Sequence, residues 1–126
     1  MKKLSVIVPV FNVSSLIVRC IDSLINQSYL NMEIIIVNDG STDDSYEYIK
    51  QYLHYPQIKY IYQKNQGLGQ ARNVGMQNST GDYISFVDSD DWVDLDLYQI
   101  MIQEMEKSKA DIALCGIKNE YNNYIS

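Results

Sequence analysis

The chain is predicted to fold as an α/β protein, with a mostly parallel sheet between two layers of helices. Strand and helix signals alternate along the sequence, which is typical of parallel sheets joined by right-handed crossover helices. Residues 33–38 read Glu-Ile-Ile-Ile-Val-Asn, a run typical of strands that are buried on both faces. The 126 residues, 46% of them hydrophobic, are enough for one domain with a core. Together these observations predict a three-layer α/β/α architecture.

The first half of the chain carries two strand signals and two helix signals. Residues 4–8 are apolar except for Ser5 and mostly β-branched, and Pro9 is expected to stop this strand because proline cannot donate to a sheet. Ser14 or Ser15 can cap the helix that follows. Its apolar residues recur at helical spacing and are Leu16, Cys20, Ile21, Leu24 and Ile25. After the strand at residues 33–38, a turn over residues 39–42 leads into a helix at 43–53.

The second half repeats this alternation. Residues 58–63 form a strand rich in isoleucine and tyrosine, and a helix at 68–78 opens with Gly67-Leu68-Gly69. Residues 83–87, Tyr-Ile-Ser-Phe-Val, read as a buried strand. A helix from about residue 95 to 107 and a strand at 111–115 complete the expected order.

Charge and cysteine content narrow the function classes. The formal net charge of −6 argues against a protein that binds nucleic acid through its backbone phosphates. Cys20 and Cys115 lack CxxC spacing and fit a reducing compartment. No stretch approaches the roughly 20 apolar residues of a membrane span, and no cleavable leader is recognisable. A cytoplasmic location is therefore expected.

Polar residues follow three of the predicted strands at the point where each strand ends. Residues 9–12 follow the first strand, Asp39 the second and Asp88 the fourth. The carboxyl ends of parallel strands share one edge of a sheet, where ligands bind in such folds. In an extended segment Asp88 and Asp90 would point to the same side, and a divalent cation would compensate their converging charges. Phosphates commonly complete the shell of such an ion, which indicates nucleotide chemistry.

A simpler interpretation of the acidic segment is a solvated turn that caps the helix near residue 95. Asp94 and Asp96 can do that capping instead. The spacing of a calcium-binding EF-hand, with its central glycine and terminal glutamate, is absent.

Four segments follow one another along the predicted strand ends and helix starts. They are Val-Pro-Val-Phe-Asn at 8–12, Ile-Val-Asn-Asp-Gly-Ser-Thr-Asp at 36–43, Gln-Gly-Leu-Gly-Gln-Ala-Arg-Asn-Val-Gly at 66–75 and Gly-Asp-Tyr-Ile-Ser-Phe-Val-Asp-Ser-Asp-Asp at 81–91. In this order they resemble the family 2 glycosyltransferases, inverting enzymes with the Rossmann-like GT-A fold. The resemblance runs from about Leu4 to Trp92. Each segment is only moderately specific, but four in this order are hard to obtain by chance.

The resemblance implies transfer of a sugar from a nucleotide diphosphate, most often a UDP-sugar, to an acceptor hydroxyl of a glycan or lipid-linked acceptor, as in polysaccharide biosynthesis. It implies Mn²⁺ or Mg²⁺ as cofactor. The family's D-x-D motif falls on residues 88–90, with Asp90 as metal ligand and Asp88 contacting ribose and metal. The nucleotide-binding residues that it implies are Pro9, Phe11, Asn12, Asp39, Arg72, Asp88 and Ser89.

Other interpretations of these residues stay open. Asp39 either binds the uracil N–H, as its counterpart in the family does, or only begins a turn. Phe11 lies against the base or in the core, and Arg72 contacts the nucleotide or is a solvated helix residue. Asp82, at the far end of its strand, is structural or orders loops near the ligand. Trp92 is expected to pack under the metal loop.

The resemblance also divides the chain. Residues 1–115 are expected to form the nucleotide-sugar-binding domain. Residues 116–126 are expected to begin an acceptor-binding portion that the chain lacks and through which peripheral association with the inner face of the membrane would occur. No general base is assigned, because Asp111 should open a strand away from the site and Glu120 has no motif around it.

Three other functions remain as alternatives. A sugar-phosphate nucleotidyltransferase needs a glycine-rich loop with arginine after the first strand, where this chain has Val-Phe-Asn-Val. A phospho-acceptor receiver domain needs an acidic pair at the same place. A non-catalytic nucleotide-binding domain would keep the donor-site residues without the transfer reaction.

Overall fold

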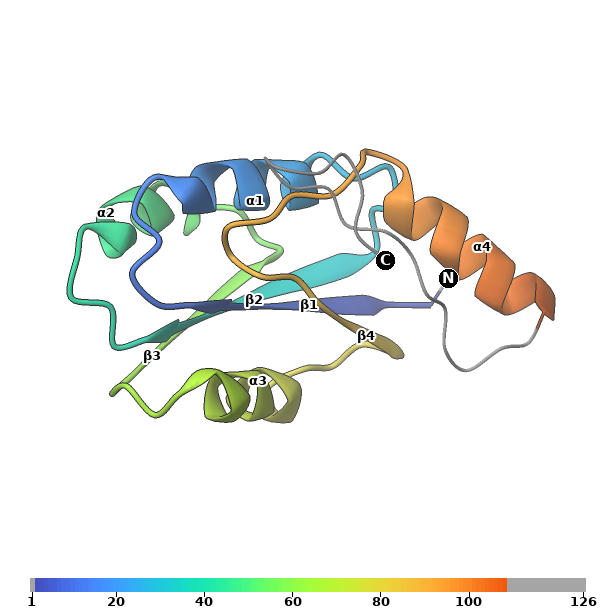
Figure 1. Ribbon diagram of the computed structural model, residues 1–126. Coiled ribbons are helices and arrows are strands. Elements are labelled where there is room, and N and C mark those ends of the chain that lie inside the picture. Colours follow the sequence, from blue (N-terminus) through green and yellow to red (C-terminus); the bar gives the residue numbers. More distant parts are fainter. Residues whose placement is uncertain (1, 109–126) are drawn as a thin grey trace.

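The computed structural model describes residues 2–108, which form a parallel sheet between two helical layers (Figure 1). In chain order the elements are β1 (Leu4–Val10), α1 (Leu16–Ile25), β2 (Met32–Asp39), α2 (Ser45–Ile49), a 3₁₀ turn (Lys50–Tyr52), β3 (Ile58–Gln63), α3 (Leu68–Gln77), β4 (Tyr83–Phe86) and α4 (Leu97–Ser108). The strand order within these residues is β3-β2-β1-β4, and every pair is parallel. Helices α1, α2 and α4 cover one face and α3 covers the other. The predicted three-layer α/β/α class is confirmed.

The core lies on both faces of β1 and β2, and every residue of these two strands is buried. On the α3 side, Ile7 and Ile35 pack with Ala71 of α3. The other face of the two strands packs against α1, α2 and α4 in a larger cluster. Gly75 lets α3 approach β1 closely, because a Cβ at this position would lie 2.4 Å from Ile7 Cγ2.

β1 does not stop at Pro9 as predicted; it continues to Val10. The Ile7 carbonyl accepts a hydrogen bond from Val87 N, on the β4 side of the strand. The backbone nitrogen of Pro9, two residues further on, points to the same side, where β4 has already ended at Phe86. The missing N–H of Pro9 therefore costs no sheet hydrogen bond.

Other boundaries differ by a few residues. The regular part of α2 is shorter than the predicted helix at 43–53, since it passes into the 3₁₀ turn after Ile49. The predicted strand at 111–115 and the predicted boundary after residue 115 lie outside the described residues. Within residues 2–108, no helix is long and apolar enough to cross a membrane.

The predicted serine cap of α1 is wrong. Ser15 occupies the N-cap position but makes no capping hydrogen bond with its side chain. Instead, Ser45 of α2 accepts hydrogen bonds through Oγ from the backbone nitrogens of Val13 (3.0 Å) and Ser14 (2.9 Å). The start of α1 is thus held by a side chain of a neighbouring helix rather than by a serine cap of its own.

Candidate functional site

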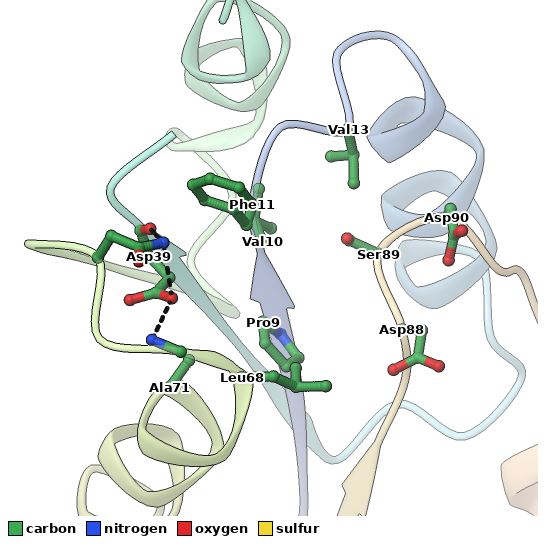
Figure 2. Close-up of a pocket in the computed structure, with 12 residues that line it drawn as sticks. Pro9, Val10, Phe11, Val13, Asp39, Leu68, Ala71, Asp88, Ser89 and Asp90 are labelled. Carbon is green, nitrogen blue, oxygen red and sulfur yellow. Dashed lines mark hydrogen bonds between the residues drawn. The ribbon is translucent and has the colours of Figure 1, made fainter. Parts of the chain in front are cut away.

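A pocket of about 350 Å³ lies at the carboxyl edge of the sheet. It is lined by the ends of β1, β2 and β4 and by the start of α3, and Figure 2 shows Asp39 on one side and the acidic turn on the other. The lining residues are Pro9, Val10, Phe11, Val13, Asp39, Asn65, Gly67, Leu68, Ala71, Asp88, Ser89 and Asp90. Six of the eight predicted site residues therefore gather around one cavity, and Asn12 and Arg72 stand beside it.

Phe11 is a surface residue of this pocket rather than a core residue. Its side chain is 49% exposed. Pro9 and Val10 lie below it along β1, and Val13 lies across the opening (Figure 2). These side chains give one half of the pocket an apolar surface with one exposed aromatic ring.

Asp39 ends β2 and is only 3% exposed. Its Oδ1 accepts hydrogen bonds from Gln63 Nε2 (2.9 Å) and Gln66 N (2.8 Å). Its Oδ2 accepts from Gly67 N (2.9 Å) and Asn65 Nδ2 (3.3 Å). A carboxylate has about four acceptor sites, so these four donors match its capacity. Asp39 thus fixes the connection between β3 and α3, a role that the sequence analysis did not predict.

The start of α3 reaches the pocket through this connection. Gly67 has φ +98°, a conformation that favours glycine, and it immediately precedes Leu68, the first residue of the helix. Leu68 and Ala71 line the pocket. The helix N-terminus carries a partial positive charge, which favours an anionic ligand at this end.

Asn12 connects two loops beside the pocket but does not line it. Its backbone has φ +50°, and its Oδ1 accepts hydrogen bonds from Thr42 N (2.8 Å) and Asp43 N (3.3 Å). The backbone N–H of Asn12 donates to Ser41 Oγ (3.0 Å). The side chain thus joins the loop after β1 to the loop after β2.

Arg72 lies one turn into α3 and is directed toward the acidic turn. Its Nη2 is 3.4 Å from Asp88 Oδ1, and its guanidinium lies 5.8 Å from the centre of the Phe86 ring. Both members of the ion pair are substantially exposed, so the pair itself stabilises the fold little. Arg72 is therefore held near Asp88, which disagrees with its interpretation as an isolated solvated residue.

Residues 88–91 form a turn rather than the extended segment that was expected. The Asp88 carbonyl accepts a hydrogen bond from Asp91 N (3.0 Å), which closes the turn. Ser89 is buried at its tip and points into the pocket (Figure 2), whereas Asp88 and Asp90 are exposed. The two carboxylates therefore reach the same pocket through a turn and not through strand alternation.

The acidic turn concentrates negative charge. Burial and the nearby charges of Asp90 and Asp88 raise the pKa of Asp91. Burial, followed by the same three aspartates, raises the pKa of the Cys20 thiol beneath them. Cys20 is thus a neutral buried thiol and not a nucleophile.

The oxygen ligands of the turn are of the type that Mg²⁺ and Mn²⁺ prefer. Among residues 2–108, no three His, Cys, Asp or Glu side chains converge to form a complete metal cage. Asp88 and Asp90 can therefore contribute only part of a coordination shell. This fits Mg²⁺-type sites, where substrate phosphates and water complete the shell around one or two carboxylates.

Some lining residues were not predicted. Val10 ends β1 and Val13 lies in the loop that follows it, but their apolar side chains carried no functional signal. Asn65 lies two residues after the end of β3 at Gln63, and its position after a strand end was the available signal.

Comparison with known proteins gives consistent relatives. Residues 5–124 match the sequence model of Glycosyl transferase family 2. Glycosyltransferase GlyA of Streptococcus pneumoniae serotype 4 is 47% identical over 113 residues, which are 89% of this chain and 16% of GlyA. The uncharacterized glycosyltransferase EpsJ of Bacillus subtilis is 44% identical over 113 residues, 89% of this chain and 33% of EpsJ. The chain thus spans a third or less of the length of these two relatives.

Solved structures agree with the sequence relatives. Staphylococcus aureus TarS superposes with a TM-score of 0.83 at 28% identity, over 90% of this chain and 21% of TarS. TarS 1–349 in complex with UDP-GlcNAc gives 0.81 at 29% identity, over 86% of this chain and 32% of that one. The mannosyltransferase PcManGT of Pyrobaculum calidifontis gives 0.74 at 21% identity, over 91% and 34%, which is a likeness of fold alone. The predicted GT-A fold is confirmed, and with the family match over residues 5–124 the chain belongs to glycosyl transferase family 2.

Proposed function

We propose that this chain is the donor-binding part of a glycosyltransferase that moves a sugar from a nucleotide diphosphate to an acceptor hydroxyl with inversion. The main support is that one pocket has an apolar half and an acidic half side by side. Its apolar half, with Phe11 and the buried acceptor Asp39, suits a flat base, and its acidic turn suits a metal-bound diphosphate. The solved complexes of TarS with UDP-GlcNAc and with UDP favour a uridine nucleotide here.

At the base end, Pro9 and Phe11 supply the contact surface and Asp39 the acceptor for the uracil N–H. The four donors around Asp39 limit how this can happen. The contact from Asn65 Nδ2, at 3.3 Å, is the longest of the four, and the same Nδ2 also donates to the Asp39 backbone carbonyl (3.0 Å). A bound base would share or replace this donor, while the two backbone donors from Gln66 and Gly67 stay in place. Asn12 would act indirectly, by holding the loop that carries Phe11.

At the diphosphate end, Asp90 would hold Mn²⁺ or Mg²⁺, and Asp88 would contact both ribose and metal. When bound, the ion supplies positive charge that stabilises the leaving diphosphate. Ser89, at the tip of the turn, places a hydroxyl in the pocket between the two halves. Arg72 would add a guanidinium near the phosphates, since its exposed pair with Asp88 at 3.4 Å is weak enough to rearrange.

We assign no general base, because every carboxylate lining the pocket already has a proposed role. The acceptor, proposed to be a glycan or a lipid-linked molecule, and a location at the cytoplasmic face of the membrane stay predictions. The Val-Phe-Asn-Val loop after Pro9 has no glycine, which disfavours a nucleotidyltransferase. A non-catalytic nucleotide-binding domain would bind the nucleotide-sugar donor but transfer no sugar from it, which distinguishes it from the proposed enzyme.

The test is titration calorimetry of UDP against the chain, in EDTA and in Mn²⁺. UDP is expected to bind in EDTA and to bind more tightly in Mn²⁺. Asp90→Asn should abolish the gain from Mn²⁺, whereas Glu104→Gln should keep it. Glu104 is a matched control because it is an exposed carboxylate of α4 that does not line the pocket.

Asp39→Ala should weaken UDP binding in EDTA as well as in Mn²⁺, since it removes the base end of the site. Absence of UDP binding under both conditions would refute the donor-site proposal. Equal losses for Asp39→Ala and Asp90→Asn in EDTA would show that the two roles are wrongly divided. Binding of UTP with a sugar phosphate, followed by diphosphate release, would support a nucleotidyltransferase instead.

A further inference from the structure

The loop that carries the acidic turn is hydrogen-bonded to side chains of α1 and of the residues just after it. Cys20, Ser23 and Gln27 follow one another at spacings of three and four, so they share one face of the helical segment. All three contact the backbone of the segment between β4 and the start of α4. We define these three residues as the α1 tether.

Gln27 makes the most extensive contacts of the tether and is only 2% exposed. Its Nε2 donates to the carbonyl of Asp94 (2.6 Å), and its Oε1 accepts from the backbone N–H of Tyr98 (3.2 Å). The same Nε2 donates to the Ser23 carbonyl (3.0 Å). One buried amide therefore links α1 to both ends of the five residues that enter α4.

Ser23 and Cys20 extend these contacts toward the turn. Ser23 Oγ accepts from Val93 N (3.2 Å) while it donates to the Cys20 carbonyl (2.7 Å). Cys20 Sγ lies 3.7 Å from the Asp88 carbonyl oxygen, as a weak sulfur donor. The tether thus holds the chain at Asp88 on one side of the acidic turn and at Val93 on the other.

A turn of this kind needs an external support. Asp88, Asp90 and Asp91 lie within four residues and carry like charges, so their repulsion favours spreading the turn. Arg72 is the cation paired with the turn among the described ion pairs, and its contact with Asp88 is long and exposed. The backbone contacts to α1 oppose the repulsion without occupying the carboxylate oxygens.

We propose that Ser23 and Gln27 are positioning residues for the metal–diphosphate end of the donor site. They fix the backbone on the far side of the acidic turn, so that Asp88 and Asp90 face the pocket before the ligand arrives. The inference rests on the proposed function. It adds two residues that neither line the pocket nor touch the proposed ligand.

The base end of the pocket has a separate support. Asp39 and its donors belong to β2 and to the connection from β3 to α3, and none of their hydrogen bonds involves Ser23 or Gln27. Loosening the tether should therefore leave UDP binding in EDTA unchanged and reduce the gain from Mn²⁺. A general loss of stability would instead lower UDP affinity both in EDTA and in Mn²⁺.

The variants are Ser23→Ala, which removes the acceptor for Val93 N, and Gln27→Met, which nearly keeps the volume but removes all three hydrogen bonds of the amide. Ser23→Thr keeps a hydroxyl and serves as the conservative rescue. Ile21→Val is the matched control, since Ile21 is a fully buried apolar residue of α1 whose side chain can make no hydrogen bond to the loop. Thermal melts of all four variants show that they fold and how much stability each loses.

Calorimetry of UDP in EDTA and in Mn²⁺ gives the affinity gain for each variant, and Mn²⁺ electron paramagnetic resonance reports the environment of the ion. Ser23→Ala and Gln27→Met should each lower the gain about tenfold, the usual size for residues that orient metal ligands. Ser23→Thr and Ile21→Val should keep it. The Mn²⁺ spectrum should broaden only in the first two variants.

Three results would overturn the inference. If Ser23→Ala and Gln27→Met both keep the wild-type gain in UDP affinity from Mn²⁺, the positioning role is refuted and the proposed function stays intact. If Ile21→Val loses as much of the affinity gain from Mn²⁺ as the two tether variants do, reduced stability alone explains the effect. No gain from Mn²⁺ in the wild-type chain would instead refute the metal role and this inference together.

Discussion

Glu33→Gln should destabilise the fold strongly, although Glu33 lies at the end of β2 opposite the pocket. Glu33 is 3% exposed. Its Oε2 accepts from Ser5 Oγ (2.5 Å) and from Thr80 N (2.6 Å), and its Oε1 pairs with Lys59 Nζ (2.6 Å). Lys3 Nζ is 3.5 Å from the same Oε1. The carboxylate thus joins β1, β2 and β3 to the connection that leads into β4.

The magnitude follows from the pKa of Glu33. Burial alone would raise this pKa, but hydrogen bonds from Lys59, Ser5 and Thr80 outweigh burial and lower the pKa from 4.5 to about 2. Each pKa unit corresponds to about 1.4 kcal/mol, so the ionised carboxylate contributes roughly 3 kcal/mol to the free energy of unfolding. Because the folded pKa is depressed, this contribution is fully present above pH 4.5 and is lost as the pH falls toward 2.

Urea unfolding followed by circular dichroism measures the effect. At pH 7 the free energy of unfolding of Glu33→Gln should be lower by roughly 3 kcal/mol than that of the wild type. Glu47→Gln is the matched control, since it removes an exposed carboxylate paired with Lys50 and should change stability by about 0.5 kcal/mol or less. Between pH 4.5 and 2 the free energy of unfolding should fall more steeply with decreasing pH in the wild type than in the variant. The difference in slope should be at most that expected for the uptake of one proton.

If the free energy of unfolding depends on pH equally in the wild type and the variant, the argument is refuted. The pKa of Glu33 would then be the same in the folded and unfolded states, and its ionisation would add nothing to stability. A loss at pH 7 no larger than that of Glu47→Gln would refute it as well. In that case the buried contacts of Glu33 would only offset the cost of removing the charge from water.

Three further predictions concern the pocket and the packing around it. Asp39→Asn should weaken UDP binding in EDTA by about tenfold, because an amide cannot accept all four hydrogen bonds; unchanged affinity in calorimetry would contradict this. Gly75→Ala should lower the free energy of unfolding by about 1–3 kcal/mol, because the new Cβ would lie 2.4 Å from Ile7 Cγ2. Gly69→Ala, with no atom within 4 Å of a new Cβ, should be neutral or stabilise α3 by up to about 1 kcal/mol, and a loss comparable to that of Gly75→Ala would contradict the packing argument.

The sequence predicted the place of the site because that place depends on topology. Once the strands are parallel, their carboxyl ends lie at one edge, and Pro9, Asp39 and Asp88 had to meet there. The detail that failed was local. Asp-Ser-Asp-Asp was taken as extended, although Asp and Ser favour turns, and the Asp91 N–H in fact closes a turn onto Asp88.

Contacts between distant segments could not be predicted from either segment alone. Nothing around Gln27 indicates that its amide will meet Asp94 and Tyr98, and nothing around Asp39 indicates a loop 24–28 residues later that will donate four hydrogen bonds. The strand through Pro9 is a similar case, because it depends on where β4 ends. A polar residue that becomes buried must find partners, but the sequence does not specify them.

The two ends of the pocket are supported by different parts of the fold, and this has a consequence for affinity. The base end depends on Asp39 and the connection before α3, whereas the acidic turn depends on α1 and the start of α4. Free-energy changes at separate, unconnected sites usually add. Asp39→Asn combined with Ser23→Ala should therefore lower UDP affinity in Mn²⁺ by the product of the two single effects. A much smaller combined loss would mean that the two ends are coupled, with Arg72 as the first residue to examine because it joins α3 to Asp88.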